Sequence, residues 1–201
     1  MAEEEHEPVE VEVVEADETP QLDPEVEARR VAAMSLIRRL GDPVLKSRAT
    51  PVDRFDDSLR KQVGRMAGIM NDALGVGLAA PQLGISQRLL IYRVGPDAPV
   101  IALANPELEW ASAESEVGEE GCLSIPGVLV DVDRHVYVRV RGLDEEGEVR
   151  VVEASGLEAR VIQHEIDHLD GVLILERTSR DERKRALREL REAEQRRDEA
   201  A

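Results

Sequence analysis

Aromatic residues and cysteine are scarce in this chain of 201 residues, which has one Phe, two Tyr, one Trp and one Cys. A single cysteine excludes an internal disulfide framework and a zinc site built from four cysteines. With so few aromatic rings the core must be aliphatic, and the stacking platforms that bind single-stranded nucleic acids are disfavoured. The length predicts one domain with a sizeable core of Val, Leu, Ile and Ala.

The chain also lacks a basic excess and a long apolar run. Its 43 acidic and 26 basic residues give a formal charge of −17, which disfavours sequence-specific binding of nucleic acid. No apolar run is long enough to span a membrane. The first residues lack the basic and apolar regions of a secretion signal. We therefore expect a cytoplasmic protein with no membrane partner.

The acidic residues are concentrated at the start, where residues 1–28 hold 12 carboxylates and no Lys or Arg. Glu and Val alternate over residues 9–15, but the charge density opposes packing. We expect an acidic disordered extension over residues 1–30, a folded domain over 31–178 and a charged C-terminal helix over 179–201. The extension is either a solvating tail or a docking segment for a basic partner.

Hydrophobic periodicity predicts a helix, then several strands, then two more helices. Asp56-Asp57-Ser58 precedes the first helical stretch, which runs to about Leu74, and the glycines at 75 and 77 are expected to end it. Capping-box patterns at Ser155 and Ser179 open the later helices. The expected strands lie at 89–92, 100–103, 128–132, 136–140 and 148–152. This order predicts an α+β fold, with antiparallel or mixed sheets packed around the central helix and with N-terminal and C-terminal helices.

The expected central helix contains His164-Glu165-Ile166-Asp167-His168. Residues four apart lie on one helical face, so both imidazoles can reach a single cation. Glu165 would then lie beside a water bound to that cation, which is the physical content of the H-E-x-x-H motif. The alternative is a pair of solvated histidines on a polar face.

A catalytic metal site usually needs three protein ligands and a water. The best candidate for the third ligand is Cys122, in Glu120-Gly-Cys-Leu-Ser124. Lone cysteines are more often small buried apolar residues, so the spacing alone leaves both interpretations open.

A third segment reads Gly75-Val-Gly-Leu-Ala-Ala-Pro-Gln82. Its glycines free the backbone for close approach to a ligand, and Gln82 could place an amide N–H at a developing oxyanion. Taken alone, the segment is also compatible with an ordinary helix stop followed by a turn.

Together the three segments resemble peptide deformylase, whose motifs G-x-G-L-A-A-P-Q, E-G-C-L-S and Q-H-E-x-D-H occur in this order. Here they are complete at residues 75–82, 120–124 and 163–168. The similarity extends to Gly41-Asp-Pro-Val-Leu45 and Ile125-Pro-Gly127, and covers roughly residues 34–180. The resemblance implies that residues 31–178 form the deformylase catalytic domain.

The resemblance implies that Cys122, His164 and His168 bind a divalent metal, usually Fe²⁺ in bacteria, with Zn²⁺ or Ni²⁺ also able to occupy the site. Glu165 would take the proton of the attacking water and pass it to the departing amine. Gln82, the Leu123 backbone N–H and the metal would hold the oxyanion. The reaction would remove the formyl group from the N-terminal N-formylmethionine of nascent polypeptides and release formate.

The expected substrate-binding residues lie beside these groups. An extended peptide would add as a strand alongside Gly75, Val76 and Gly77, and Gly121 would also contact it. Val76, Val161 and Ile162 are candidates for the pocket that takes the methionine side chain.

The sequence departs from the family where many members carry an arginine near the substrate mouth, and here Leu129 and Asp133-Arg134 occupy those places.

The C-terminal helix, with eight basic and five acidic residues over 180–197, is either a solvated helix or a surface that docks on the ribosome. Two rival functions remain: an H-E-x-x-H endopeptidase, and a catalytically weak ribosome-associated homologue.

Overall fold

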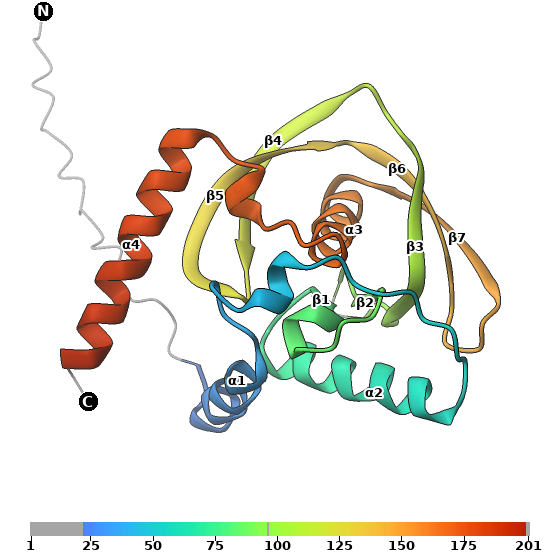
Figure 1. Ribbon diagram of the computed structural model, residues 1–201, viewed down its shortest axis with the longest axis horizontal. Helices are drawn as coiled ribbons and strands as arrows, with labels where there is room; N and C mark the ends of the chain where they lie inside the picture. The colour runs from blue at the N-terminus through green and yellow to red at the C-terminus, as the bar shows by residue number, and fades with distance from the viewer. Residues whose placement is uncertain (1–21, 96, 200–201) are drawn as a thin grey trace, which may run out of the picture.

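The computed structural model describes residues 22–95 and 97–199 as an α+β fold, which confirms the predicted class (Figure 1). The α-helices are α1 (Pro24–Leu36), α2 (Asp57–Asp72), α3 (Gly156–Leu169) and α4 (Arg180–Glu199). Short 3₁₀ helices are η1 (Pro43–Lys46), η2 (Ala80–Leu83) and η3 (Ile174–Glu176). None of these helices is both long and apolar enough to cross a membrane.

The strands form one large and one small antiparallel sheet. Five strands pair in the order β1-β2-β3-β6-β7, and β4 pairs with β5 as a separate hairpin. The strand bounds are β1 (Gly77–Ala79), β2 (Leu89–Tyr92), β3 (Ile101–Ala111), β4 (Ser115–Cys122), β5 (Ile125–His135), β6 (Tyr137–Leu143) and β7 (Val149–Ser155). Helix α3 lies in the middle, enclosed by strands of both sheets (Figure 1).

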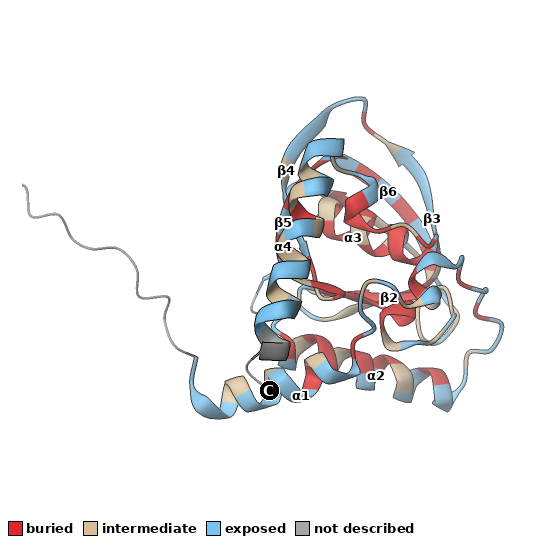
Figure 2. Cartoon of the chain, turned by 60° about the vertical axis from the view of Figure 1, so that its left-hand side comes forward, coloured by how far each residue is buried: buried red, intermediate tan, exposed pale blue. Residues whose placement is uncertain are grey.

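Helix α3 is buried on most of its circumference (Figure 2). Its apolar residues, such as Ile162 and Leu169, pack against Leu90, Leu103 and Val140 of the large sheet. The helix also buries four polar residues: Gln163, Glu165, Asp167 and His168. Burying polar groups costs free energy unless each is paired or used, so this helix is where a functional site is expected.

The prediction of disorder over residues 1–30 is wrong for residues 24–30, which belong to α1. Asp23 caps the helix by accepting a hydrogen bond from the Glu25 N–H at 2.8 Å, and Pro24 follows in the first turn. Ala33 and Ile37 anchor this segment in the core formed with α2. Residues 1–21 lie outside the described part of the chain, so the acidic extension stays a prediction there.

Two details of the helix ends differ from expectation. The left-handed residue after α2 is Leu74, with φ of 59°, and not one of the glycines that follow. Ser155 makes no capping hydrogen bond at the start of α3, and the Glu158 carboxylate accepts a hydrogen bond from the Tyr92 hydroxyl at 3.1 Å. Ser179 does accept a hydrogen bond from the Glu182 N–H, as the second capping pattern predicts.

Strand β4 was not predicted, although it carries Cys122. Its sequence, Ser-Glu-Val-Gly-Glu-Glu-Gly-Cys, has two glycines and three glutamates, and these residue types are depleted in strands. The strand forms by pairing with β5 from Ser115 opposite His135 to Gly121 opposite Leu129. Pairing with a partner strand therefore overrides the local preference of this segment.

Candidate active site

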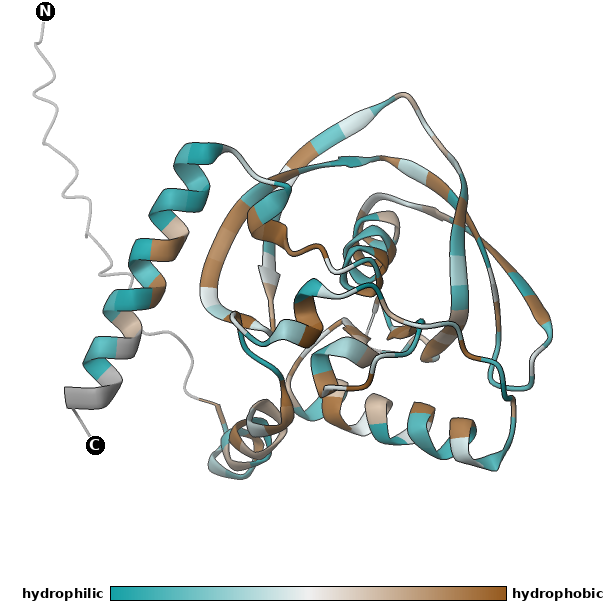
Figure 3. Cartoon of the chain, in the orientation of Figure 1, coloured by the Kyte–Doolittle hydropathy of each residue, from teal (hydrophilic) through white to brown (hydrophobic). Residues whose placement is uncertain are grey.

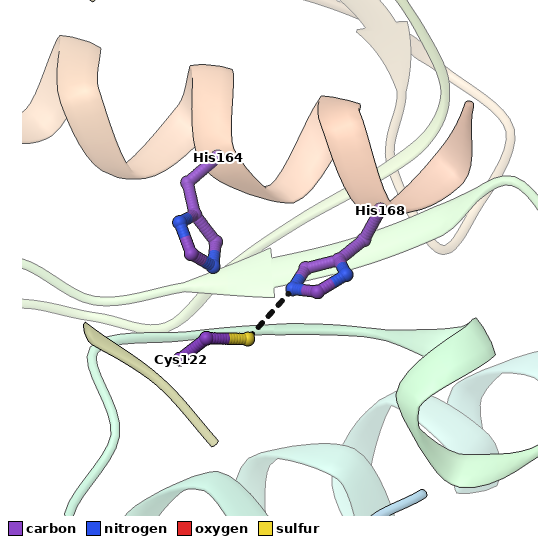
Figure 4. Close-up of side chains that lie close together, drawn as sticks. All are labelled: Cys122, His164 and His168. Atoms are coloured by element: carbon purple, nitrogen blue, oxygen red, sulfur yellow. Dashed lines mark hydrogen bonds between the residues drawn. The ribbon is translucent and has the colours of Figure 1, made fainter. Parts of the chain in front are cut away.

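Three potential metal ligands meet where the end of β4 faces α3. The donor atoms of Cys122, His164 and His168 all lie within 4.8 Å of one another. The Cys122 Sγ is 3.3 Å from the His168 Nε2, and both imidazole rings point from α3 toward the sulfur (Figure 4). The ladder between β4 and β5 shifts register between Gly121 and Cys122. Such an irregularity re-aims the side chain that follows it.

Each of these groups changes the pKa of its neighbours. Burial alone would raise the pKa of the Cys122 thiol, but the adjacent imidazoles of His168 and His164 lower it well below its ordinary value. Burial would lower the pKa of His164, but its contacts with Cys122 and Glu120 raise it well above its ordinary value. The lowered pKa favours the thiolate, which is the form that binds metals.

The donor set fits a divalent transition metal. One thiolate and two imidazoles suit Zn²⁺ and Fe²⁺, and three protein ligands leave a coordination position for water. The buried His168 Nδ1 has no hydrogen-bond partner among the described residues, and its Nε2 faces the Cys122 sulfur.

Glu120 orients His164. The Glu120 Oε2 lies 3.0 Å from the His164 Nδ1, which leaves Nε2 directed at the ligand cluster. Burial alone would raise the pKa of Glu120, but hydrogen bonds from Arg134 and His164 lower it to about 2. Glu120 is therefore an ionised acceptor at neutral pH, and sequence reasoning assigned it no such role.

Glu165 lies beside the cluster and is 4% exposed. Burial raises the pKa of its carboxyl, and its Oε2 has no hydrogen-bond partner among the described residues. Its other oxygen lies against Gly77, where an added Cβ would stand 2.4 Å from Oε1. A buried carboxyl with a raised pKa and an unpartnered oxygen is suited to accept and return a proton.

Gln82 reaches the same place from η2. Its Oε1 accepts a hydrogen bond from the Ala79 N–H at 2.8 Å, which fixes the direction of the amide. Its Nε2 lies 3.4 Å from the Ser124 Oγ and 3.8 Å from the Cys122 Sγ. The side chain, 1% exposed, thus presents an N–H donor at the ligand cluster. A fixed donor of this kind can stabilise an oxyanion.

Comparison with known proteins gives a consistent result. A sequence model of the family described as polypeptide deformylase matches residues 34–184. The peptide deformylase of Thermotoga sp. (strain RQ2) is 50% identical over 146 residues, which cover 73% of this chain and 88% of that protein. That of Acidothermus cellulolyticus is 47% identical over 162 residues, covering 81% of this chain and 88% of the relative.

The chain belongs to the polypeptide deformylase family.

Solved deformylase structures share the fold. The Synechococcus elongatus deformylase, crystallised in complex with actinonin, superposes with a TM-score of 0.74 at 44% identity, covering 76% of this chain and 85% of that one. The Thermotoga maritima deformylase gives a TM-score of 0.69 at 48% identity, covering 71% and 96%. The predicted family and enzyme class are thus confirmed, and the family's metal dependence agrees with the donor set.

The residues predicted to contact a deformylase substrate fall into two groups. Val76 is 48% exposed on the segment that enters β1, and β1 is an edge strand of the large sheet. An added Cβ at Gly75 would lie 3.0 Å from the Leu123 Cδ1, so this segment also adjoins the residue after Cys122. Val161 and Ile162 are buried in the core between α3 and the large sheet. Ile162 has no exposed surface, so we assign it to the core.

Leu129 and Asp133 are the two positions where the sequence departs from the family, and Arg134 follows the second of them. Leu129 is 51% exposed, and its Cδ2 would lie 3.1 Å from a Cβ at Gly121. Arg134 is buried and does not line a substrate mouth. It forms two hydrogen bonds with Glu120 and a third, at 2.6 Å, with Asp167 of α3. The side chain of Arg134 therefore joins the hairpin to α3 beneath the metal ligands.

Proposed function

We propose that this chain removes the formyl group from the N-terminal N-formylmethionine of nascent polypeptides and releases formate. The observation that carries the proposal is the convergence of Cys122, His164 and His168 with the buried Glu165 and the Gln82 amide. Membership of the polypeptide deformylase family supports the same reaction.

Cys122, His164 and His168 would hold one divalent cation, and the resemblance to bacterial deformylases supports Fe²⁺ in the cell, with Zn²⁺ or Ni²⁺ able to replace it. When bound, such a cation supplies a Lewis acid that lowers the pKa of water from about 15.7 toward about 7. The Cys122 thiolate contributes a negative charge to the ligand set and moderates this acidity.

Glu165 and Gln82 have separate roles in the reaction. Glu165 receives the proton of the attacking water and delivers it to the amine of the departing methionine. The Gln82 Nε2 and the Leu123 backbone N–H donate hydrogen bonds to the oxygen of the formyl group as negative charge develops there. Removal of one such donor typically costs about 10²–10³ in turnover.

The peptide would bind in extended form along the edge of β1. Gly75, Val76 and Gly77 offer backbone groups for strand addition, and Gly121 borders the path on the hairpin. We assign the pocket for the methionine side chain to the half-exposed Val76 and, of the two buried candidates, to Val161, which keeps 7% of its surface exposed.

The test is formate release from formyl-Met-Ala-Ser by protein purified anaerobically with Fe²⁺, beside Glu165→Ala. General acid–base catalysis typically contributes about 10²–10⁴, so the variant should lose at least 10²-fold while it retains the metal. Glu153→Ala, which removes an exposed carboxylate of β7, is the matched control and should remain active. A metal-loaded wild type that releases no formate overturns the proposal, and cleavage of unformylated peptides instead favours the endopeptidase.

We further propose that this reaction takes place in the cytoplasm and that α4 docks near the ribosomal exit. Helix α4 is mostly hydrophilic (Figure 3), and its exposed basic residues include Arg183, Lys184, Arg188 and Arg191. Because Ala186 is fully buried and Leu190 packs on the same core, deletion of α4 would damage the fold.

Reversal of the exposed charges is therefore a sharper test of docking than deletion. The variant Arg183→Glu, Lys184→Glu, Arg188→Glu should co-sediment with ribosomes several-fold less than the wild type, while formate release from the tripeptide is unchanged. A control variant with Arg139→Glu and Arg141→Glu reverses charge on the large sheet. Equal co-sedimentation of all three proteins contradicts docking through α4.

A further inference from the structure

Arg160 connects α3 to the β4–β5 hairpin. It lies one helical turn before His164 and two turns before His168, so its side chain leaves α3 on the same face. The guanidinium donates to four acceptors on the hairpin, at distances between 2.7 and 3.3 Å. These acceptors are the backbone oxygens of Glu116, Gly118 and Val132 and the Oε1 of Glu120.

Gly118 provides the space for this contact. A Cβ at Gly118 would lie 2.9 Å from the Arg160 Nη2 and 3.1 Å from its Cζ, so any side chain there would displace the guanidinium. Gly118 is paired with Val132 across the hairpin, and the Arg160 side chain is 16% exposed. The Arg160 guanidinium is therefore enclosed beside the Gly118–Val132 pair of the β4–β5 hairpin.

The ligands of the site are divided between the two elements that Arg160 joins. The hairpin carries Cys122 and Glu120, whereas α3 carries His164 and His168. Any displacement of the hairpin along α3 changes the distance from the thiolate to both imidazoles. It also changes the hydrogen bond that the His164 ring donates to the Glu120 carboxylate.

We propose that Arg160 is a positioning residue for the metal site. Its side chain holds the β4–β5 hairpin at the position along α3 where the three donor atoms converge. This inference rests on the ligand set of the proposed function. Arg134 bonds both oxygens of Glu120 and would keep that carboxylate ionised in a chain without Arg160. The contribution of Arg160 is thus the placement of the hairpin, and the ionisation of Glu120 does not depend on it.

The test compares Arg160→Met, Gly118→Ala and the double variant, each loaded with Co²⁺. The rate of metal release to a chelator and the visible spectrum of the Co²⁺ complex are the readouts. Groups that support metal ligands typically contribute 10–100-fold to affinity, so each single variant should release Co²⁺ about 10–100-fold faster. Both substitutions remove the same contact, so the double variant should release metal no faster than the faster single variant.

Arg139→Met is the matched control, because Arg139 forms an exposed ion pair with Glu153 on the large sheet. Its release rate and spectrum should equal those of the wild type. The inference is overturned if Arg160→Met and Gly118→Ala release Co²⁺ within about twofold of the rate of this control and have the same visible spectrum. A lower thermal stability of these variants would not change that conclusion. A wild type that binds Co²⁺ but has no deformylase activity would overturn the proposed function and leave this comparison intact.

Discussion

Gly77 determines where the proposed proton carrier can lie. Glu165 is buried on α3, and its Oε1 occupies the volume that a side chain at residue 77 would fill. The position has no positive φ, so the requirement for glycine here comes from the approach of the carboxylate and not from the backbone conformation.

Gly77→Ala should therefore reduce catalysis without releasing the metal. The new methyl group would overlap the Glu165 carboxylate, whose side chain can rotate away, so the fold is retained while the proton carrier is displaced. We expect formate release to fall by at least 10²-fold, within the range that general acid–base catalysis supplies. The measurement is turnover of formyl-Met-Ala-Ser beside the metal content of the purified variant.

Gly68→Ala is the control for this substitution, because a Cβ at Gly68 meets no atom within 4 Å. It should behave as the wild type in both assays. A Gly77→Ala variant with wild-type turnover would show that the position of Glu165 does not limit the reaction.

Local spacing predicted some of these residues, and tertiary contacts supply the rest. The interval of four between His164 and His168 indicates a shared helical face from sequence alone. Glu120 lies two residues before Cys122 and shares its face of β4, but this relation is visible only once the segment is known to be a strand. Arg160 had no signal in the sequence, since its acceptors lie 28 to 44 residues away in the chain.

Between elements, a buried ionic network joins the hairpin to α3. Arg134 of β5 bonds Glu120 of β4 and Asp167 of α3, and Arg177 bonds the same aspartate from beyond η3. The side chains of Arg134, Glu120 and Asp167 are 6%, 4% and 9% exposed. Removal of one partner from such a network leaves buried charge without compensation.

Arg134→Met should lower the free energy of unfolding by about 3–5 kcal/mol, because it leaves Glu120 and Asp167 as buried carboxylates with fewer partners. Urea unfolding of the metal-free proteins provides the measurement, since it separates this effect from metal binding. Arg139→Met removes an exposed ion pair and should cost no more than about 1 kcal/mol. Equal midpoints for the two variants would contradict a stabilising role for the network.

Some helices and strands could likewise be predicted from the local sequence, whereas others form only through tertiary contacts. Strand β2 was predicted with its observed bounds, because four consecutive apolar residues flanked by polar ones suit a buried strand. Strand β4 was not predicted, since only its pairing with β5 makes a strand of a segment rich in glycine and glutamate. Helix α1 was not predicted, because its anchoring residues, Ala33 and Ile37, come after a long acidic run.

Across the whole molecule, the metal site lies where three hydrophobic clusters meet. Cys122 belongs to the cluster of the hairpin and α4, while Leu123 packs against the cluster of α1 and α2. The histidines come from α3, whose apolar face packs on the large sheet. A cation held by Cys122 and both histidines would therefore connect parts of the molecule that have separate cores.

Removal of the metal should consequently lower the stability of the whole fold. A ligand that binds only the native state adds about 2.7 kcal/mol when its free concentration is 100 times its Kd. For a chain of this length, that corresponds to a melting temperature lower by roughly 5–10 °C after chelation. The measurement is thermal unfolding, followed by circular dichroism, of the Ni²⁺-loaded and chelator-treated protein.

The Cys122→Ala variant distinguishes the stability lost with the bound metal from any other effect of the chelator on the melting temperature. Without the thiolate the site keeps two imidazoles, binds metal weakly and should melt at the same temperature with and without chelator. The variant should also fold, because the substitution removes only one sulfur atom from a small buried side chain at the last residue of β4 and leaves the backbone pairing with β5 in place. If chelation lowered the melting temperature of wild type and variant equally, the loss would not come from the cysteine–histidine site. If chelation lowered neither melting temperature, the three clusters would be stable without the cation, and the site would contribute to catalysis alone.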